Sequence, residues 1–157
     1  TIATISGPQA MASGRDRRDG YVAAIEAAGM EVDDALVVEG DFSEQSGWAG
    51  MEELLQRRPD IDGVFAASDL MAMGAMRSLR AHGRRVPDDV GVIGFDGTTA
   101  SETTEPPLST VRQPLVELGR GMAEMLLRLV DAGEPRAEHV VLPVEVLQRG
   151  SSVLDRG

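Results

Sequence analysis

The sequence predicts an α/β protein with a doubly wound, mostly parallel sheet and helices on both faces. Short runs of apolar, often β-branched residues alternate with longer segments whose apolar residues recur at helical spacing, which is the order of elements in such a fold. The runs are continuously apolar instead of alternating with polar residues, as is typical of parallel strands covered on both sides. The length of 157 residues favours a single domain.

Three strand–helix units and a fourth strand are expected in the first part of the chain. Gly29, Pro59 and Gly83 stand where the three helices are expected to end. The expected elements are a strand at 1–7, a helix from Ser13 to Gly29, a strand at 35–40, a helix at 43–58 capped by Ser43 or Asp41, a strand at 63–68, a helix at 69–82 and a strand at 90–95.

The second part of the chain departs from this alternation. A long polar loop is expected at 96–110, followed by a short strand at 109–113 and a helix at 115–131 that ends at Gly133. The final strand is expected at 139–150. Pro143 interrupts it and favours an edge position or a change of sheet, because proline cannot donate a ladder hydrogen bond.

Composition excludes several classes of function. The net charge of −11 makes this segment a poor candidate for direct contact with nucleic acid. No apolar stretch is long enough to cross a bilayer. The chain has no cysteine, and its two histidines, His82 and His139, stand far apart, so we expect no metal, no cofactor and no histidine-based catalysis.

Polar and aromatic residues follow the ends of all four predicted strands. In open α/β sheets, ligands bind beyond the carboxyl ends of the strands. A carboxylate there accepts hydrogen bonds from two vicinal hydroxyls, an arginine donates a fork of hydrogen bonds, and an aromatic face covers a sugar or stacks on a base. The sequence therefore predicts a site for a polyol or a heterocycle. The candidate ligand-binding residues are Ser13, Arg17, Phe42, Ser68, Asp69 and Asp96.

Each candidate also has a purely structural interpretation. Arg17 is at a position that suits a solvated surface charge, and Phe42 is a candidate core residue. Ser68 and Asp69 are types favoured at a helix N-terminus. Asp96, before a glycine, is a candidate for capping a turn through its own side chain.

Enzymatic interpretations have weaker support. No G-x-G-x-x-G or G-K-[ST] motif follows a predicted strand. Asp41, Asp69 and Asp96 at successive strand ends could form a Mg²⁺ site of the receiver or phosphatase kind. Against this, the first strand ends in Ser-Gly-Pro where a receiver has an acidic pair, and the chain contains no lysine. We therefore expect a binding module and not an enzyme.

Five ordered stretches carry a resemblance to a known family. They are "GP…RDRRDGYVAAIEAAG", "EGDFSEQSGWAGMEELL", "VFAASDLMAMGAMRSLRAHGRRVPDDVGVIGFDGT", "PPLSTVRQP" and "VVLPVEVLQRGSS". Together they resemble the effector-binding core of LacI/GalR transcriptional regulators, which has a periplasmic-binding-protein-like fold of type I. The resemblance covers nearly the whole chain.

The resemblance implies roles for individual residues. It makes Arg17 the effector arginine, Phe42 the stacking aromatic, Ser68 a polar ligand contact and Asp96 the aspartate that accepts hydrogen bonds from the effector. Relatives often carry an acidic or amide residue where this chain has Gly97, so that contact is absent here. Ser13 lies in a loop that commonly adds polar contacts.

The resemblance also implies a division of the chain. Residues 1–112 would form the C-terminal subdomain, residues 113–143 would cross to an N-terminal subdomain, and residues 144–157 would return. The chain has no initiator methionine and no export signal, so we expect it to be a piece of a longer protein. DNA would be contacted only by a headpiece that this piece lacks.

A homodimer is expected from the helix at 69–82. Besides its core-facing residues it carries Leu70 and Met73, which either complete the core or mark an interface. The resemblance favours the interface, because the family's dimer contact involves this helix and the loop at 100–105. The expected interface residues are Leu70, Met73, Arg77, Thr103 and Thr104.

The sequence thus predicts a cytoplasmic, effector-sensing domain that performs no chemistry. Its effector is expected to be a sugar or sugar derivative, with a nucleoside as the next choice. The alternatives are a periplasmic sugar-binding receptor of the same fold and the Mg²⁺-dependent domain.

Overall fold

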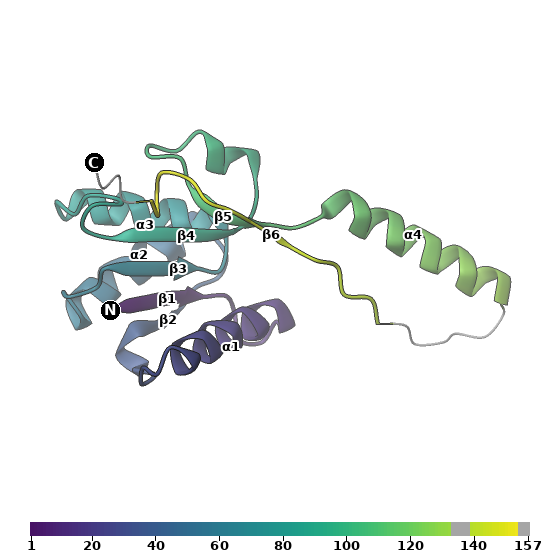
Figure 1. The fold of residues 1–157 in the computed structure, drawn as a ribbon, viewed down its shortest axis with the longest axis horizontal. Helices are drawn as coiled ribbons and strands as arrows, with labels where there is room; N and C mark the ends of the chain where they lie inside the picture. The colour runs from purple at the N-terminus through teal and green to yellow at the C-terminus, as the bar shows by residue number, and fades with distance from the viewer. Residues whose placement is uncertain (133–138, 154–157) are drawn as a thin grey trace.

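The computed structural model describes residues 1–132 and 139–153 and contains six strands and four α-helices (Figure 1). The elements, in order, are β1 (Ile2–Ser6), α1 (Ala12–Ala27), the 3₁₀ helix η1 (Asp34–Leu36), β2 (Val37–Glu39), α2 (Glu44–Arg57), β3 (Gly63–Ala66), α3 (Asp69–Ala81), β4 (Gly91–Asp96), the 3₁₀ helix η2 (Thr99–Glu102), β5 (Ser109–Arg112), α4 (Leu115–Ala132) and β6 (Glu145–Leu147).

The six strands form one sheet in the order β2-β1-β3-β4-β5-β6. The first five are parallel, and β6 pairs antiparallel with β5. The predicted doubly wound, mostly parallel sheet is confirmed. Because β1 to β5 run in one direction, their carboxyl ends lie along one edge of the sheet and bring distant parts of the sequence together.

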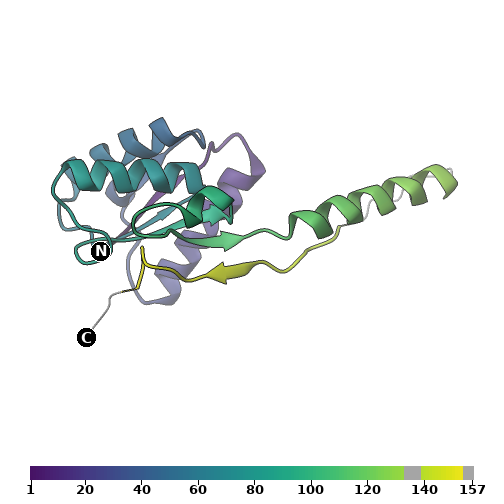
Figure 2. The ribbon, with the colours of Figure 1, turned by 90° about the horizontal axis from the view of Figure 1, so that it is seen from above.

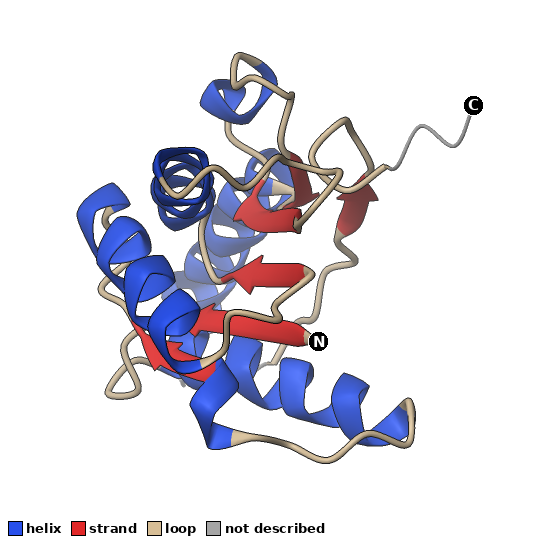
Figure 3. Ribbon diagram, turned by 90° about the vertical axis from the view of Figure 1, so that its left-hand side faces the viewer, coloured by secondary structure: helices blue, strands red, loops and turns tan. Residues whose placement is uncertain are grey.

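Helices α2 and α3 cover one face of the sheet and lie against each other (Figure 3). Glycines allow this close approach: a Cβ at Gly74 of α3 would lie 2.0 Å from the carbonyl oxygen of Glu44, and one at Gly47 of α2 would lie 2.1 Å from that of Met71. The core lies between these helices and the sheet, with Ile5, Met51, Leu54, Met71, Leu79 and Val92 fully buried.

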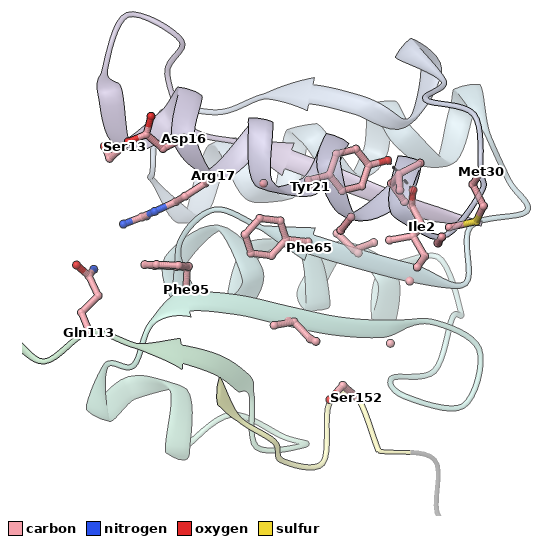
Figure 4. Close-up of a pocket in the computed structure, with 18 residues that line it drawn as sticks. Ile2, Ser13, Asp16, Arg17, Tyr21, Met30, Phe65, Phe95, Gln113 and Ser152 are labelled. Carbon is pink, nitrogen blue, oxygen red and sulfur yellow. Dashed lines mark hydrogen bonds between the residues drawn. The ribbon is translucent and has the colours of Figure 1, made fainter. Parts of the chain in front are cut away.

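The opposite face is covered only in part, by α1. Tyr21 of α1 donates a hydrogen bond to the carbonyl oxygen of Ile2 in β1. Beside α1 an apolar groove of about 880 Å³ runs along the sheet, lined among others by Phe65, Ile93 and Phe95. Figure 4 shows Ser13, Arg17 and Gln113 at one end of the groove and Ile2 and Met30 at the other. The covering of both faces expected from the continuously apolar strands is therefore incomplete in this chain.

Helix α4 extends away from the sheet, and the segment that returns to β6 runs back beside it (Figures 1 and 2). Its apolar residues are exposed, Met122 by 65% and Leu126 by 62%. The strand expected at 139–150 is wrong in extent, because only Glu145–Leu147 pairs with β5. Pro143 precedes this edge strand, as proline's missing donor requires. The expected helix end at Gly133 lies outside the described residues.

Side-chain caps mark the starts of two of the four described α-helices. Ser43 and Ser68 cap α2 and α3 by accepting hydrogen bonds from the backbone N–H groups of Ser46 and Met71. The prediction that Ser13 caps α1 is wrong, because the helix begins at Ala12 and Ser13 lies in its first turn. Gly29 and Gly83 adopt the left-handed conformation just after α1 and α3, as expected. No helix in the described ranges is long and apolar enough to cross a membrane.

Candidate functional site

The ends of β1, β2, β3 and β4 meet around a hollow of about 280 Å³. Five of the six residues predicted to bind ligand contribute to its wall, from four separate loops and helix starts. The hollow is lined by Ser13, Arg17, Phe42, Ser68, Leu70 and Asp96.

Arg17 stands between the wall of the hollow and the sheet. Its Nη2 lies 3.5 Å from Oδ1 of Asp96, and its Nη1 donates a hydrogen bond to the carbonyl oxygen of Ala67. Its Cζ lies 3.8 Å from the ring centroid of Phe95 and 5.7 Å from that of Phe42. The side chain is only 15% exposed, so the interpretation of Arg17 as a solvated surface charge is wrong. Burial lowers the pKa of Arg17, and the neighbouring Asp96 charge opposes that effect.

Asp96 ends β4 with its carboxylate directed at Arg17 and Gln113. The Nε2 of Gln113 donates a hydrogen bond of 2.8 Å to Oδ1 of Asp96. Burial is the main reason that the pKa of Asp96 is raised, and the charge of Asp69 adds to it, whereas Arg17 and the Gln113 hydrogen bond lower it. The backbone of Asp96 has a φ of +126°, a conformation rare for a residue with a side chain.

The turn after Asp96 is held by other side chains. Gly97 N–H donates to Oγ1 of Thr110, and Thr98 N–H donates to Oδ2 of Asp69 over 2.7 Å. Asp69, and not Asp96, is thus the carboxylate that accepts the backbone hydrogen bond of this turn. Oδ1 of Asp96 lies against Arg17 and Gln113 instead, and the residue lines the hollow.

Phe42 lies in a tight turn that the side chain of Asp41 stabilises. The N–H of Ser43 donates to Oδ1 of Asp41 over 2.9 Å, and Phe42 has a φ of +70°. A Cβ at Gly7 would lie 2.3 Å from the tip of the Phe42 ring, so a side chain at position 7 would displace the ring. Phe42 is partly buried and packs against the core, so it serves both as a packing residue and as a wall of the hollow.

Ser68 and Asp69 have different places. Ser68 caps α3 and also donates a hydrogen bond to the carbonyl oxygen of Phe42 while lining the hollow. Asp69 has no exposed surface and lies beneath the hollow, with hydrogen bonds from Thr98 and Thr110. The structure therefore does not bear out direct ligand contact by Asp69, because its oxygens already accept three hydrogen bonds inside the protein.

The Mg²⁺ alternative does not fit this arrangement. Within the described residues no three acidic or histidine side chains lie close enough to hold a metal ion together. Asp41 accepts a hydrogen bond from the backbone of its own turn, Asp69 is buried and accepts from threonine hydroxyls, and Asp96 faces the guanidinium of Arg17.

Comparison with known proteins identifies the family and the fold. Residues 1–152 match the family described as the periplasmic binding protein-like domain. The chain belongs to this family. It is 50% identical over 150 residues to the HTH-type transcriptional regulator CelR of Thermobifida fusca, covering 96% of this chain and 44% of CelR. It thus spans less than half the length of this relative.

Solved structures of LacI-type regulators have the same fold. The structure of a transcriptional regulator CelR–cellobiose complex superposes with a TM-score of 0.93 at 50% identity, covering 96% of this chain and 46% of that one. The Lac repressor dimer bound to operator and the anti-inducer ONPF gives a TM-score of 0.90 at 30% identity, covering 98% and 53%. The expected family is confirmed, and these relatives are regulators and not enzymes.

The five residues expected at the dimer interface lie in two different places. Met73, Arg77 and Thr104 line another hollow, of about 170 Å³, beside α3, and Thr103 is exposed nearby. Arg77 pairs with Glu44 across the two helices. Leu70, which is 49% exposed, opens into the first hollow among the ligand candidates instead.

The structure adds three residues that sequence reasoning missed at this site. Phe95 stacks under Arg17, Gln113 binds Asp96, and Leu70 lines the hollow. Gln113 directly follows β5, whose end was left out of the set of strand ends. Phe95 immediately precedes Asp96 and occupies the opposite face of β4, where period-2 alternation places it beside α1.

Proposed function

We propose that this chain is the effector-sensing part of a LacI-type transcriptional regulator and binds a sugar in the hollow at the strand ends. The observation that carries the proposal is the convergence of Arg17, Phe42 and Asp96 on one hollow. The guanidinium supplies donors, the carboxylate supplies acceptors for hydroxyls, and the ring supplies an apolar face, which together suit a pyranose.

We favour a disaccharide of the cellobiose kind as effector. A relative with 50% identity over 96% of this chain has been solved as a complex with cellobiose. The open groove of about 880 Å³ shares Ser13 and Arg17 with the hollow, and its wall beyond them is mostly apolar, so the site offers room and an apolar surface beyond a single sugar unit.

The rest of the site is proposed to come from a second subdomain in the complete protein. Helix α4 and the segment leading to β6 expose apolar side chains such as Met122, Leu126 and Val141, which need a covering partner. We infer that residues 113–143 cross to that subdomain, that residues 1–112 form the subdomain described here, and that residues 144–157 return to it. The effector would then lie between the two.

Effector binding is proposed to act by a population shift. A ligand that contacts both subdomains stabilises their closed arrangement, and the differential affinity for the two arrangements sets how strongly DNA binding changes. The homodimer is proposed to form through Met73, Arg77, Thr103 and Thr104, in a cytoplasmic protein that contacts operator DNA only through a separate headpiece.

Calorimetry on the complete protein tests this function. Cellobiose, other disaccharides, monosaccharides and nucleosides are titrated into the protein, and operator release is followed by gel shift at fixed salt. We expect one sugar class to bind and to change operator affinity. Binding of a nucleoside and of no sugar would contradict the sugar assignment, and an absence of operator binding would contradict the regulatory role.

A further inference from the structure

We propose that Asp69 is a positioning residue that fixes the turn carrying Asp96 and thereby sets the affinity for the effector. Asp69 lies beneath the hollow and touches no part of its open wall. The inference rests on the proposed function of the hollow, and it concerns a residue that would contact no ligand itself.

Three hydrogen bonds tie Asp69 to the turn after β4 and to the neighbouring strand β5. Its Oδ2 accepts from the N–H of Thr98 over 2.7 Å and from the hydroxyl of Thr98 over 2.8 Å. Its Oδ1 accepts from the hydroxyl of Thr110 in β5. That hydroxyl oxygen in turn accepts from the N–H of Gly97 over 3.2 Å. Asp69 thus holds both residues that follow Asp96, one directly and one through Thr110.

The surroundings of Asp69 stabilise its buried carboxylate and leave room for it. Asp69 is the first residue of α3, where the helix dipole favours a negative charge. Gly94 pairs with Thr110 in the sheet, and a Cβ at Gly94 would lie 2.6 Å from Oδ1 of Asp69. A buried carboxylate is tolerated only when donors satisfy it, and here three donors do so.

The backbone of Asp96 explains why such an anchor is needed. A φ of +126° is costly for a residue with a side chain and persists only where the surrounding structure fixes it. Once the anchors on Gly97 and Thr98 are lost, the turn can relax, and the carboxylate of Asp96 then leaves its place 3.5 Å from Arg17.

The same helix start also holds the other wall of the hollow. Ser68, the neighbour of Asp69, donates its hydroxyl to the carbonyl oxygen of Phe42, which has a φ of +70°. Two adjacent residues at the start of α3 therefore anchor two ligand-facing residues whose backbones are both strained. The start of α3 sets the distance between them.

A pair of substitutions at Thr110 tests the proposal in the complete protein. Thr110→Val keeps the shape and removes the hydroxyl that links Asp69 to Gly97, whereas Thr110→Ser keeps the hydroxyl and is the matched control. Asp69→Asn is the direct variant. We expect Thr110→Val and Asp69→Asn to lower cellobiose affinity at least tenfold, and Thr110→Ser to stay within about threefold of the wild type.

A second readout does not depend on the effector. Crystal structures of the effector-free Thr110→Val and Thr110→Ser proteins report the φ of Asp96 and its distance from Arg17. We expect both to change in the valine variant and to persist in the serine variant. Wild-type affinity and an unchanged Asp96 in Thr110→Val would overturn the proposal, even if Asp69→Asn failed to fold. If the wild type binds no cellobiose and Asp96 still moves in Thr110→Val, positioning by Asp69 is supported and the cellobiose assignment is contradicted.

Discussion

Arg17 lies between an aspartate and an aromatic ring: its Nη2 is 3.5 Å from Oδ1 of Asp96, and its Cζ is 3.8 Å from the ring centroid of Phe95. The ring and the carboxylate restrict the guanidinium from two sides, so its plane is fixed before any ligand arrives. A group that is already ordered loses little conformational entropy on binding. In the proposed site, this arrangement preorganises Arg17 as a donor for hydroxyl or ring oxygens.

Arg17→Lys is expected to weaken effector binding at least tenfold, because lysine keeps the charge but has neither the planar fork nor the face that stacks on Phe95. Calorimetry with cellobiose on the complete protein measures the change. Arg15→Lys is the matched control, because Arg15 is exposed and bonds only the nearby carbonyl oxygen of Gln9 among the described contacts. Equal losses in the two variants would show that the effect is general and not specific to Arg17.

Asp96→Asn is expected to weaken effector binding about 10- to 100-fold, since a hydrogen bond to a charged group contributes about 1.5–3 kcal/mol. The same change is expected to stabilise the effector-free protein slightly at pH 7. The pKa of Asp96 is raised on folding, so the ionised form is less favourable in the folded state than in the unfolded state.

The sign of that stability effect can be checked by its pH dependence. The stabilisation associated with a raised pKa is fully present below the ordinary carboxyl value and is lost as pH rises through the folded value. The gain from Asp96→Asn should therefore appear near neutral pH and vanish at about pH 3, where both proteins carry an uncharged group. A thermal midpoint that falls at pH 7 would contradict this interpretation.

The residues around the hollow could be predicted because their types are informative at strand ends. Asp96 ends β4, Phe42 lies in the loop after β2, and Arg17 lies in the helix that follows β1. The rule for open sheets brings these three residues together around the hollow. The sequence could not distinguish Asp69 from these residues, because a carboxylate after a strand has the same sequence pattern whether it faces the hollow or the core. The hydrogen bonds from Thr98 and Thr110 hold Asp69 in the interior, and both threonines are distant from it in sequence.

The extent of the strands was harder to predict than the succession of strands and helices along the chain. The apolar run at 139–150 has the composition of a strand, but a strand needs a partner, and only Glu145–Leu147 reaches β5. The incomplete cover beside α1 has a similar origin. Apolar strands such as β3 and β4 indicate that something covers both faces, and they do not indicate that the cover lies within residues 1–157.

Asp41→Ala is expected to lower both stability and effector affinity, because Asp41 holds the turn that presents Phe42. Hydrogen bonds from the side chain and backbone of Ser43 lower the pKa of Asp41 to about 2. A lowered pKa contributes stability above the ordinary value that is lost as pH falls through the folded value. The difference in urea midpoint between wild type and variant should therefore be clear at pH 6 and shrink between about pH 4 and pH 2.

Asp19→Asn on the exposed side of α1 is the control for this titration. It changes the net charge by the same amount and should give a urea midpoint close to that of the wild type at each pH. A pH-independent difference for Asp41→Ala would show that the turn is stabilised by the shape of the aspartate and not by its ionised form.

Gly74→Ala is expected to destabilise the protein by about 1–3 kcal/mol or more, the range typical of overpacking. The new Cβ would lie 2.0 Å from the carbonyl oxygen of Glu44 and 2.7 Å from the backbone nitrogen of Trp48. Both are backbone atoms, so no side-chain rotation relieves the contact, and α2 must move away from α3. Gly121→Ala in α4 is the control, because its Cβ meets nothing within 4 Å and helix propensity then favours alanine by up to about 1 kcal/mol. The urea midpoints of the two variants should therefore shift in opposite directions. A Gly74→Ala midpoint equal to that of the wild type would mean that α2 and α3 lie farther apart than the structure places them.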